Sequence, residues 1–329
     1  MINRLQQYCF RWNLVLNKDK SKIMVFRKGG RLSRNEKWYY GEDPIQIVNE
    51  YKYLGVTFTP TLSLSKHFSS KLTSARYGIN SLWRKFIGSE DVPLSTKWQV
   101  FETVSRTTIT YAGQVWGYQR REDVECFNRF FMKRMFGLPQ NTPNYILYLE
   151  SGRDIMWLQT LKMHFKYILK ALALPDHRYP KILTSLVVQS NSGWCSEWKQ
   201  LFNQFNEGWV DPITQPDRWG MTCDNIIDKI RRNVLGTWWE KASNSQFHQI
   251  YYTLRTDNAV MKDYLNDSNK RRMINIIFRA RGSLLPLNFR VDRGENSYIC
   301  SLCNSQEIED IYHFIGKCKV LSEYRVKCS

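Results

Sequence analysis

The amino-acid sequence predicts a mainly α-helical protein that carries a small α+β piece near its N-terminus. Between about residues 65 and 174, apolar side chains recur every three or four positions in separate stretches, which is the spacing of amphipathic helices. Between about residues 22 and 58, short apolar runs are instead separated by turns that contain Gly or Pro, as in strands and hairpins. The chain has 329 residues, 43% hydrophobic and 24% charged, which is enough for about two domains or three small ones.

The first expected element is a helix over residues 2–16, in which Leu5, Cys9 and Trp12 share one face. No capping residue or lead-in precedes this pattern. Because a natural domain rarely opens inside a helical pattern, we expect Met1 to be an internal start or a truncation point.

Strand-like segments follow this first helix. The short apolar run 22–26 ends in a basic turn, and residues 38–48 predict a hairpin whose turn lies at 41–44. The segment 51–58 predicts a further strand, with Gly55 at a bulge or a close backbone approach. Residues 1–60 therefore form the expected α+β piece.

Helices are expected to dominate residues 61–175. Apolar stripes or helix boundaries place four of them at 68–86, 93–110, 124–138 and 153–174. These lengths and short connections are typical of an antiparallel bundle, in which the stripes form the core. Residues 176–270 are less regular and rich in Trp and Pro, so we interpret them as a connector in which 225–242 is the clearest helix.

The charge of the chain limits its partners. Lys and Arg number 48 and Asp and Glu 30, which gives a formal net charge of +18 and a pI of about 9.5. Such an excess attracts polyanions, and nucleic acid or an anionic membrane is the usual partner. No run is long and apolar enough to cross a bilayer, and no secretory signal is present. We therefore expect nucleic acid and no membrane, and an intracellular location, nuclear or cytoplasmic, without secretion.

The sharpest chemical motif lies near the C-terminus, where Cys300, Cys303, His313 and Cys318 form the pattern C-x2-C-x9-H-x4-C. A gap of two residues lets both thiolates of a tight turn point at one ion, and a gap of four returns His and Cys to one side. Three sulfurs and one nitrogen suit tetrahedral Zn²⁺, and four protein ligands leave no open position. The motif predicts a structural zinc site, with Cys328 as a spare thiol; the alternative is a chance pattern with a core histidine.

Basic side chains accompany both the zinc motif and the first bundle helix. Near the motif lie Lys270, Arg271, Arg272, Arg279, Arg281, Arg290 and Arg293, and on the first bundle helix lie Lys71, Arg76, Arg84 and Lys85. A basic surface beside a small zinc module indicates nucleic-acid contact, and the alternative is a solvated charged face. We find no Ser/His/Asp arrangement, no P-loop and no GxGxxG motif, so the chain offers no catalytic residue.

Several further motifs occur in a specific order. The first motif, at the end of the N-terminal helix, consists of Trp12, Leu14, Leu16, Asn17, Lys20, Ser21 and Lys22. The second is Tyr53-Leu54-Gly55, and the next two are the segments 111–117 (YAGQVWG) and 138–143 (LPQNTP). The last motif runs from His313 to Cys318 and is followed by Arg325. In these motifs the sequence resembles the non-LTR retrotransposon reverse transcriptases, especially the jockey-like arthropod group. The resemblance extends from about residue 5 to 325 and is weakest over 175–265.

The resemblance implies four parts: a palm remnant with a primer-grip-like hairpin (1–60), a helical thumb (61–175), a Trp-rich connector (176–270) and a zinc-knuckle module (271–329). It also implies that Lys20, with Lys22 as neighbour, approaches the leaving pyrophosphate, and that Tyr53, Leu54 and Gly55 hold the primer end. The alternatives are a solvated helix end and an ordinary strand turn. The family's metal-binding aspartates lie upstream of the first helix, and this chain has no Asp-Asp pair. Mg²⁺ therefore belongs only to an intact polymerase.

Three functions follow as hypotheses. The first is a fragment of an RNA-directed DNA polymerase that binds RNA and DNA as template, primer and hybrid. This fragment would be inactive alone and would depend on the missing N-terminal polymerase portion. The second is a stand-alone or domesticated RNA- or DNA-binding protein with a structural zinc site. The third is a basic helical protein-interaction module.

Overall fold

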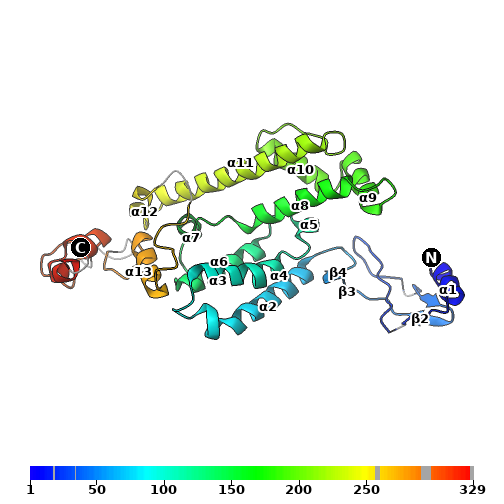
Figure 1. Ribbon diagram of the computed structural model, residues 1–329, viewed down its shortest axis with the longest axis horizontal. Helices are drawn as coiled ribbons and strands as arrows, with labels where there is room; N and C mark the ends of the chain where they lie inside the picture. Colours follow the sequence, from blue (N-terminus) through cyan, green and yellow to red (C-terminus); the bar gives the residue numbers. More distant parts are fainter. Residues whose placement is uncertain (18, 34, 256–259, 290–297, 327–329) are drawn as a thin grey trace. The chain divides into compact units, whose positions relative to one another are not determined.

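The computed structural model describes residues 1–17, 19–33, 35–255, 260–289 and 298–326 (Figure 1). Internal contacts divide the chain into two compact units, Met1–Tyr77 and Gly78–Ser329, here called the N-terminal and C-terminal units. The chain is mainly helical, with two small hairpins near its N-terminus, as the sequence predicts. In the described part of the chain, no helix has the length and apolarity that a membrane crossing requires.

In its described residues, the N-terminal unit contains one short helix, two separate two-stranded antiparallel sheets and the first part of a longer helix that continues into the C-terminal unit. Its elements are α1 (Ile2–Arg11), β1 (Trp38–Tyr40), β2 (Asp43–Ile45), β3 (Tyr51–Tyr53) and β4 (Val56–Phe58). The first hairpin turns at Gly41 and Glu42, a shorter turn than the predicted 41–44, and Pro44 pairs with Tyr39 inside the sheet. An edge strand tolerates this proline because its missing N–H faces away from the ladder.

The prediction of one continuous strand over 51–58 is wrong. Tyr53 pairs with Val56, so the chain reverses at Leu54 and Gly55, whose φ angles are 45° and 79°. Both φ angles are positive, as a two-residue type I′ turn requires. The predicted strand 22–26 is likewise reduced to a single bridge between Ile23 and Ile47.

Helix α2 (Ser65–Leu82) links the two units and continues into a π-helical turn, Trp83–Ile87. The C-terminal unit then contains α3 (Leu94–Val100), a π-helical segment Phe101–Arg106, α4 (Thr107–Ile109), α5 (Gly113–Trp116), α6 (Glu122–Phe136), α7 (Asn144–Ser151), α8 (Met156–Leu172), α9 (Tyr179–Gln189), α10 (Trp194–Gln204), α11 (Pro216–Ser243), α12 (Gln249–Thr253), α13 (Arg271–Arg281) and α14 (Ser322–Val326). Helix α8 lies beside part of the longer α11, which also contacts α7 (Figure 1).

The predicted helices are present, although the first ends at Arg11 and not at residue 16. The region after residue 175 is more regular than expected. Helix α6 ends at Gly137, whose φ of 68° is the left-handed conformation that closes helices. Helix α7 was not expected from the pattern. The predicted connector contains α9, α10 and the 28-residue α11, which begins nine residues earlier than the predicted 225–242.

The core of the C-terminal unit is aromatic. Phe101 stacks on Phe131 with ring centroids 4.1 Å apart, and Trp98 meets Phe131 edge-on at 5.7 Å. A second cluster lies where α8, α10 and α11 meet, around Trp198 and Trp219, which are 1% and 0% exposed. Many of the aromatic side chains therefore serve packing, since large rings contribute most to buried area.

Candidate metal centre and basic residues

A short hairpin-like loop positions the first two sulfur ligands. Ile299 and Ile308 form an antiparallel bridge, the Cys300 N–H donates to the Glu307 carbonyl at 2.9 Å, and the Glu309 N–H donates to the Tyr298 carbonyl at 2.7 Å. Cys300 and Cys303 lie on the turn between these paired segments. Their side chains consequently converge, as a two-residue spacing allows.

The remaining two ligands belong to a single π-helical turn, His313–Lys317, and the residue after it. The carboxylate of Asp310 accepts the His313 N–H at 2.7 Å and caps the start of this turn. The Cys318 N–H donates to the His313 carbonyl at 2.7 Å, which returns Cys318 to the side of the histidine. The gap of four residues thus places Cys318 on the same side as His313, so both can face one metal ion.

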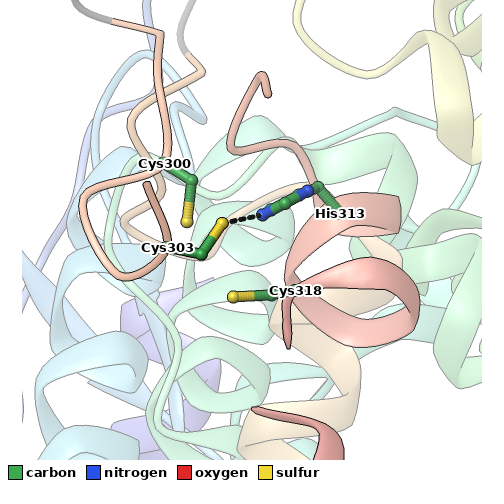
Figure 2. Close-up of side chains that lie close together, drawn as sticks. All are labelled: Cys300, Cys303, His313 and Cys318. Carbon is green, nitrogen blue, oxygen red and sulfur yellow. Dashed lines mark hydrogen bonds between the residues drawn. The ribbon is translucent and has the colours of Figure 1, made fainter. Parts of the chain in front are cut away.

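Figure 2 shows the four side chains pointing toward one another. Their ligand atoms all lie within 4.8 Å of one another, and all four residues are buried. In a tetrahedral site with Zn–S distances of about 2.3 Å, ligand atoms are separated by roughly 3.8 Å. The donor chemistry and spacing therefore fit Zn²⁺, and four protein ligands would make the site structural and leave no position for substrate.

Glu307 orients the histidine of this cluster. Its Oε2 lies 2.6 Å from His313 Nδ1, and His313 Nε2 lies 3.2 Å from the Cys303 sulfur. A carboxylate on one ring nitrogen places the proton there and leaves the other nitrogen free to bind a metal. Glu307 was not among the predicted site residues, although it is an acid six residues before the predicted histidine ligand.

The surroundings of the thiols and the imidazole also change their acidity. Hydrogen bonds from the Ser305 side chain and backbone lower the pKa of Cys303 to about 6, whereas burial raises the pKa of Cys300. Burial lowers the pKa of His313, but its hydrogen bonds with Glu307 and Cys303 outweigh burial and raise it overall. Cys303 is thus the ligand most ready to bind metal as a thiolate at neutral pH.

The arginines of α13 are largely engaged within the protein. Arg271 donates to the backbone carbonyls of Met135 and Arg134, both at 2.9 Å, at the C-terminal end of α6. Arg281 forms an ion pair with the fully buried Glu150 at 2.8 Å. Arg279 donates to the Leu284 carbonyl at 3.3 Å, and only Arg272 among these four is classed as exposed.

Arg84 and Lys85, the other predicted contacts in the C-terminal unit, are exposed in the π-helical turn. The N-terminal unit holds the remaining predicted residues. Lys20 and Arg76 are exposed, and Lys22 donates to Gln46 Oε1 at 2.7 Å.

Lys71 is half-buried, and burial lowers its pKa. Tyr53 and Leu54 are 59% and 75% exposed at the tip of the second hairpin, beside Gly55. Arg290, Arg293 and Cys328 lie outside the described residues.

One comparison with known proteins gives a match. Over 114 residues the chain is 27% identical to the "Probable RNA-directed DNA polymerase from transposon X-element" of Drosophila melanogaster. The aligned segment covers 35% of this chain and 12% of the relative's length. No family model and no solved structure matches the chain. A part of the chain is therefore related to a retrotransposon reverse transcriptase.

Proposed function

We propose that the chain is the nucleic-acid-holding C-terminal part of a non-LTR, jockey-like retrotransposon reverse transcriptase. The observation that carries this proposal is the similarity to the transposon RNA-directed DNA polymerase. The Cys3His cluster near the C-terminus supports it independently. In this proposal, 1–60 is a palm remnant, 61–175 a thumb, 176–270 a connector and 271–329 a zinc-knuckle module.

The role of this part is to position RNA and DNA. Two-metal polymerases bind their ions through aspartates, and the sequence has no Asp-Asp pair to form the family's catalytic turn. The chain therefore supplies positive charge and exposed side chains at the second hairpin, Tyr53 and Leu54, to template, primer and hybrid. Bond formation, Mg²⁺ binding and nuclear or cytoplasmic targeting depend on the intact polymerase.

Two measurements test the proposal. The chain is titrated with single-stranded RNA, RNA–DNA hybrid and DNA duplex at about 50 mM and about 200 mM salt, and we expect measurable affinity that falls steeply with salt. In a single-turnover primer-extension assay with Mg²⁺, we expect no incorporation. An absence of salt-dependent affinity for every nucleic acid, or incorporation of even a few nucleotides, overturns it.

A free-standing nucleic-acid-binding protein is the second candidate function. It is favoured by the candidate zinc site, because all four of its ligands come from this chain. An open reading frame upstream of Met1 that encodes a Tyr-x-Asp-Asp turn would decide for the polymerase fragment.

A protein-interaction module is the third candidate function. It is favoured by α9, where Tyr179, Leu183 and Leu186 are 78%, 59% and 54% exposed along one helical face. That module would bind other proteins and show little preference for nucleic acid.

A further inference from the structure

Helix α8 has two faces of opposite character. Its apolar face is used entirely inside the protein, where Leu161, Phe165 and Ile168 are 0%, 3% and 2% exposed. Its outer face carries Lys162, Lys166 and Lys170, all exposed. The apolar stripe of this helix was predicted to be core, and its lysines are not among the predicted nucleic-acid contacts.

The three lysines form a straight row. Residues four apart lie almost above one another on a helix, separated by about 6 Å along its axis, so the row spans about 12 Å. Lys162 lies 3.7 Å from Asp224 of α11 in a pair whose side chains are 51% and 69% exposed. Such an exposed pair is weak. Among the residues that the structure describes, neither Lys166 nor Lys170 forms an ion pair with an acidic side chain.

The arginines of α13 differ from the lysines of α8 in their hydrogen-bond partners. Arg271, Arg279 and Arg281 donate to backbone carbonyls or to the buried Glu150 and are therefore occupied by the protein itself. Among the described residues, the ammonium groups of Lys166 and Lys170 on α8 have no such acceptors. A chain with a net charge of +18 thus presents an ordered cationic row on α8, in which Lys162 forms one exposed pair and no described acid pairs with Lys166 or Lys170.

We infer that Lys162, Lys166 and Lys170 on α8 bind the phosphate backbone of a single nucleic-acid strand. The inference rests on the proposed function, and it assigns the contact to residues outside the predicted set. Spacing along a rigid helix suits a regularly charged linear polymer. Tyr167, 37% exposed beside Lys170 in the next turn, adds a flat face against which a base can stack.

A membrane surface fits this helix less well. Interfacial helices bury an apolar face among lipid chains, whereas the apolar face of α8 is already buried against the protein. An anionic bilayer would meet only the lysine tips. Nucleic acid needs no insertion, because phosphate contacts are made at the surface.

The test uses the full chain and a fluorescein-labelled single-stranded RNA oligonucleotide. Lys166→Gln/Lys170→Gln removes two charges from the row, and Arg232→Gln/Lys241→Gln removes two exposed charges from α11. For single strands, each lost phosphate contact makes the slope of log affinity against log salt shallower by about 0.7. We therefore expect the α8 variant to be shallower by about 1.4 and the α11 variant to match the parent. Lys166→Arg/Lys170→Arg should restore the slope.

Each outcome is decisive. Equal slopes for the α8 and α11 variants overturn this inference but leave the proposed function intact. Failure of the parent chain to bind the single-stranded RNA overturns this inference, and failure to bind RNA–DNA hybrid and DNA duplex as well overturns the proposed function. Binding to phosphatidylserine vesicles that is lost in the α8 variant, with RNA binding unchanged, assigns the row to a membrane and overturns the inference. Circular dichroism and thermal unfolding of all variants exclude misfolding as the cause.

Discussion

At the scale of single residues, His313 illustrates how a ligand is prepared by its neighbours. The Glu307 carboxylate holds Nδ1, so Nε2 faces the cysteine sulfurs. Because an unfolded chain rarely preforms such a site, metal binding adds directly to folding free energy. The stability of residues 298–326 should therefore depend on the metal.

Replacement of Cys303 tests the site. We expect the purified parent chain to contain one equivalent of zinc, and Cys303→Ser to lose it because three ligands bind far more weakly. Native mass spectrometry and elemental analysis give the stoichiometry. Cys126→Ser removes an exposed thiol outside the cluster and serves as the matched control. Equal zinc content in both variants would contradict the assignment.

His164 is a buried residue with a structural role. Its Nδ1 lies 2.8 Å from the Gln114 carbonyl and donates to it, and its Nε2 accepts the Trp198 indole N–H at 3.2 Å. The neutral imidazole therefore satisfies both partners and links α5, α8 and α10. A second proton on Nε2 would face another donor.

Acid should destabilise the chain through this histidine. Burial lowers the pKa of His164 from 6.5 to about 4. Between these values the unfolded chain binds a proton that the folded chain excludes. The free energy of unfolding therefore falls as the pH falls from about 6.5 to about 4, by at most about 3 kcal/mol, and this group contributes no further loss below pH 4. Urea unfolding at several pH values measures the effect.

His164→Asn is the control for this titration. Its amide can still donate to the Gln114 carbonyl but does not titrate. The variant should be less stable at pH 7, since it leaves space beside Trp198, and its stability should depend less on pH in this range. An unchanged pH dependence would assign the acid sensitivity to other groups.

At the scale of elements, contacts between helices explain features that look local in the sequence. Helix α8 has no side-chain cap of its own, because its N-cap residue is Ile155. The buried carboxylate of Glu125, from α6, accepts the Trp157 N–H at 3.0 Å and caps it instead. Sequence analysis did not assign this acid to another helix. Burial raises the pKa of Glu125, and the hydrogen bonds that it accepts from Trp157 and Tyr148 act in the opposite direction.

Gly117 sets the distance between α5 and α8. A Cβ at this position would lie 2.0 Å from the Thr160 carbonyl oxygen, so the backbones would have to separate. We expect Gly117→Ala to lower the free energy of unfolding by about 3 kcal/mol. Gly236→Ala, in open space on α11, should raise it by about 0.5–1 kcal/mol. Denaturant titration compares them, and a neutral Gly117→Ala would show that the helices are free to shift.

The ion pair between Glu150 and Arg281 joins α7 to α13. Glu150 also accepts hydrogen bonds from the Tyr251 and Tyr264 hydroxyls, at 3.0 and 2.6 Å, and its side chain is fully buried. Removal of one partner leaves a buried charge uncompensated, so Arg281→Met should cost about 3–5 kcal/mol. Arg272→Met, on the exposed side of α13, should cost less than about 0.5 kcal/mol.

The same two variants separate structure from recognition. Arg281→Met should lower the thermal unfolding temperature, whereas Arg272→Met should lower RNA affinity and leave thermal unfolding unchanged. If Arg281→Met instead unfolds like the parent and loses RNA affinity, the predicted nucleic-acid role of Arg281 is correct and the structural one is wrong.

At the scale of the whole molecule, the two units differ in how much apolar surface they bury. In the N-terminal unit, Phe10 and Val15 are 90% and 94% exposed, and each sheet has two strands. Isolated two-stranded sheets are marginally stable in water. The core helices α6 and α8 of the C-terminal unit are instead packed on aromatic clusters.

Amide hydrogen exchange should reveal this difference. We expect fast exchange across residues 1–60 and slow exchange in α6 and α8, because protection follows burial and cooperative packing. Mass spectrometry of peptic peptides measures both in one experiment. Equal protection in the two units would mean that the N-terminal unit is stabilised by contacts that its exposed apolar side chains do not suggest.

Sequence patterns predicted several features whose cause is local. Helix stripes and the spacing of Cys300, Cys303, His313 and Cys318 depend on residues a few positions apart, so periodicity and motif spacing predicted them. The strand over 51–58 was wrong because a turn with positive φ at Leu54 has no strong signal in the residue type.

Only the tertiary structure determined which basic side chains are paired within the protein and which remain available to bind a partner. Arg281 and Lys166 look alike in the sequence, but Glu150, 131 residues away, neutralises the former, and no described acid pairs with the latter. The same holds for Gly117, whose constraint comes from Thr160 on another helix. The physical reason is that charge compensation and steric contact depend on distances in space, which a pattern along the chain does not record.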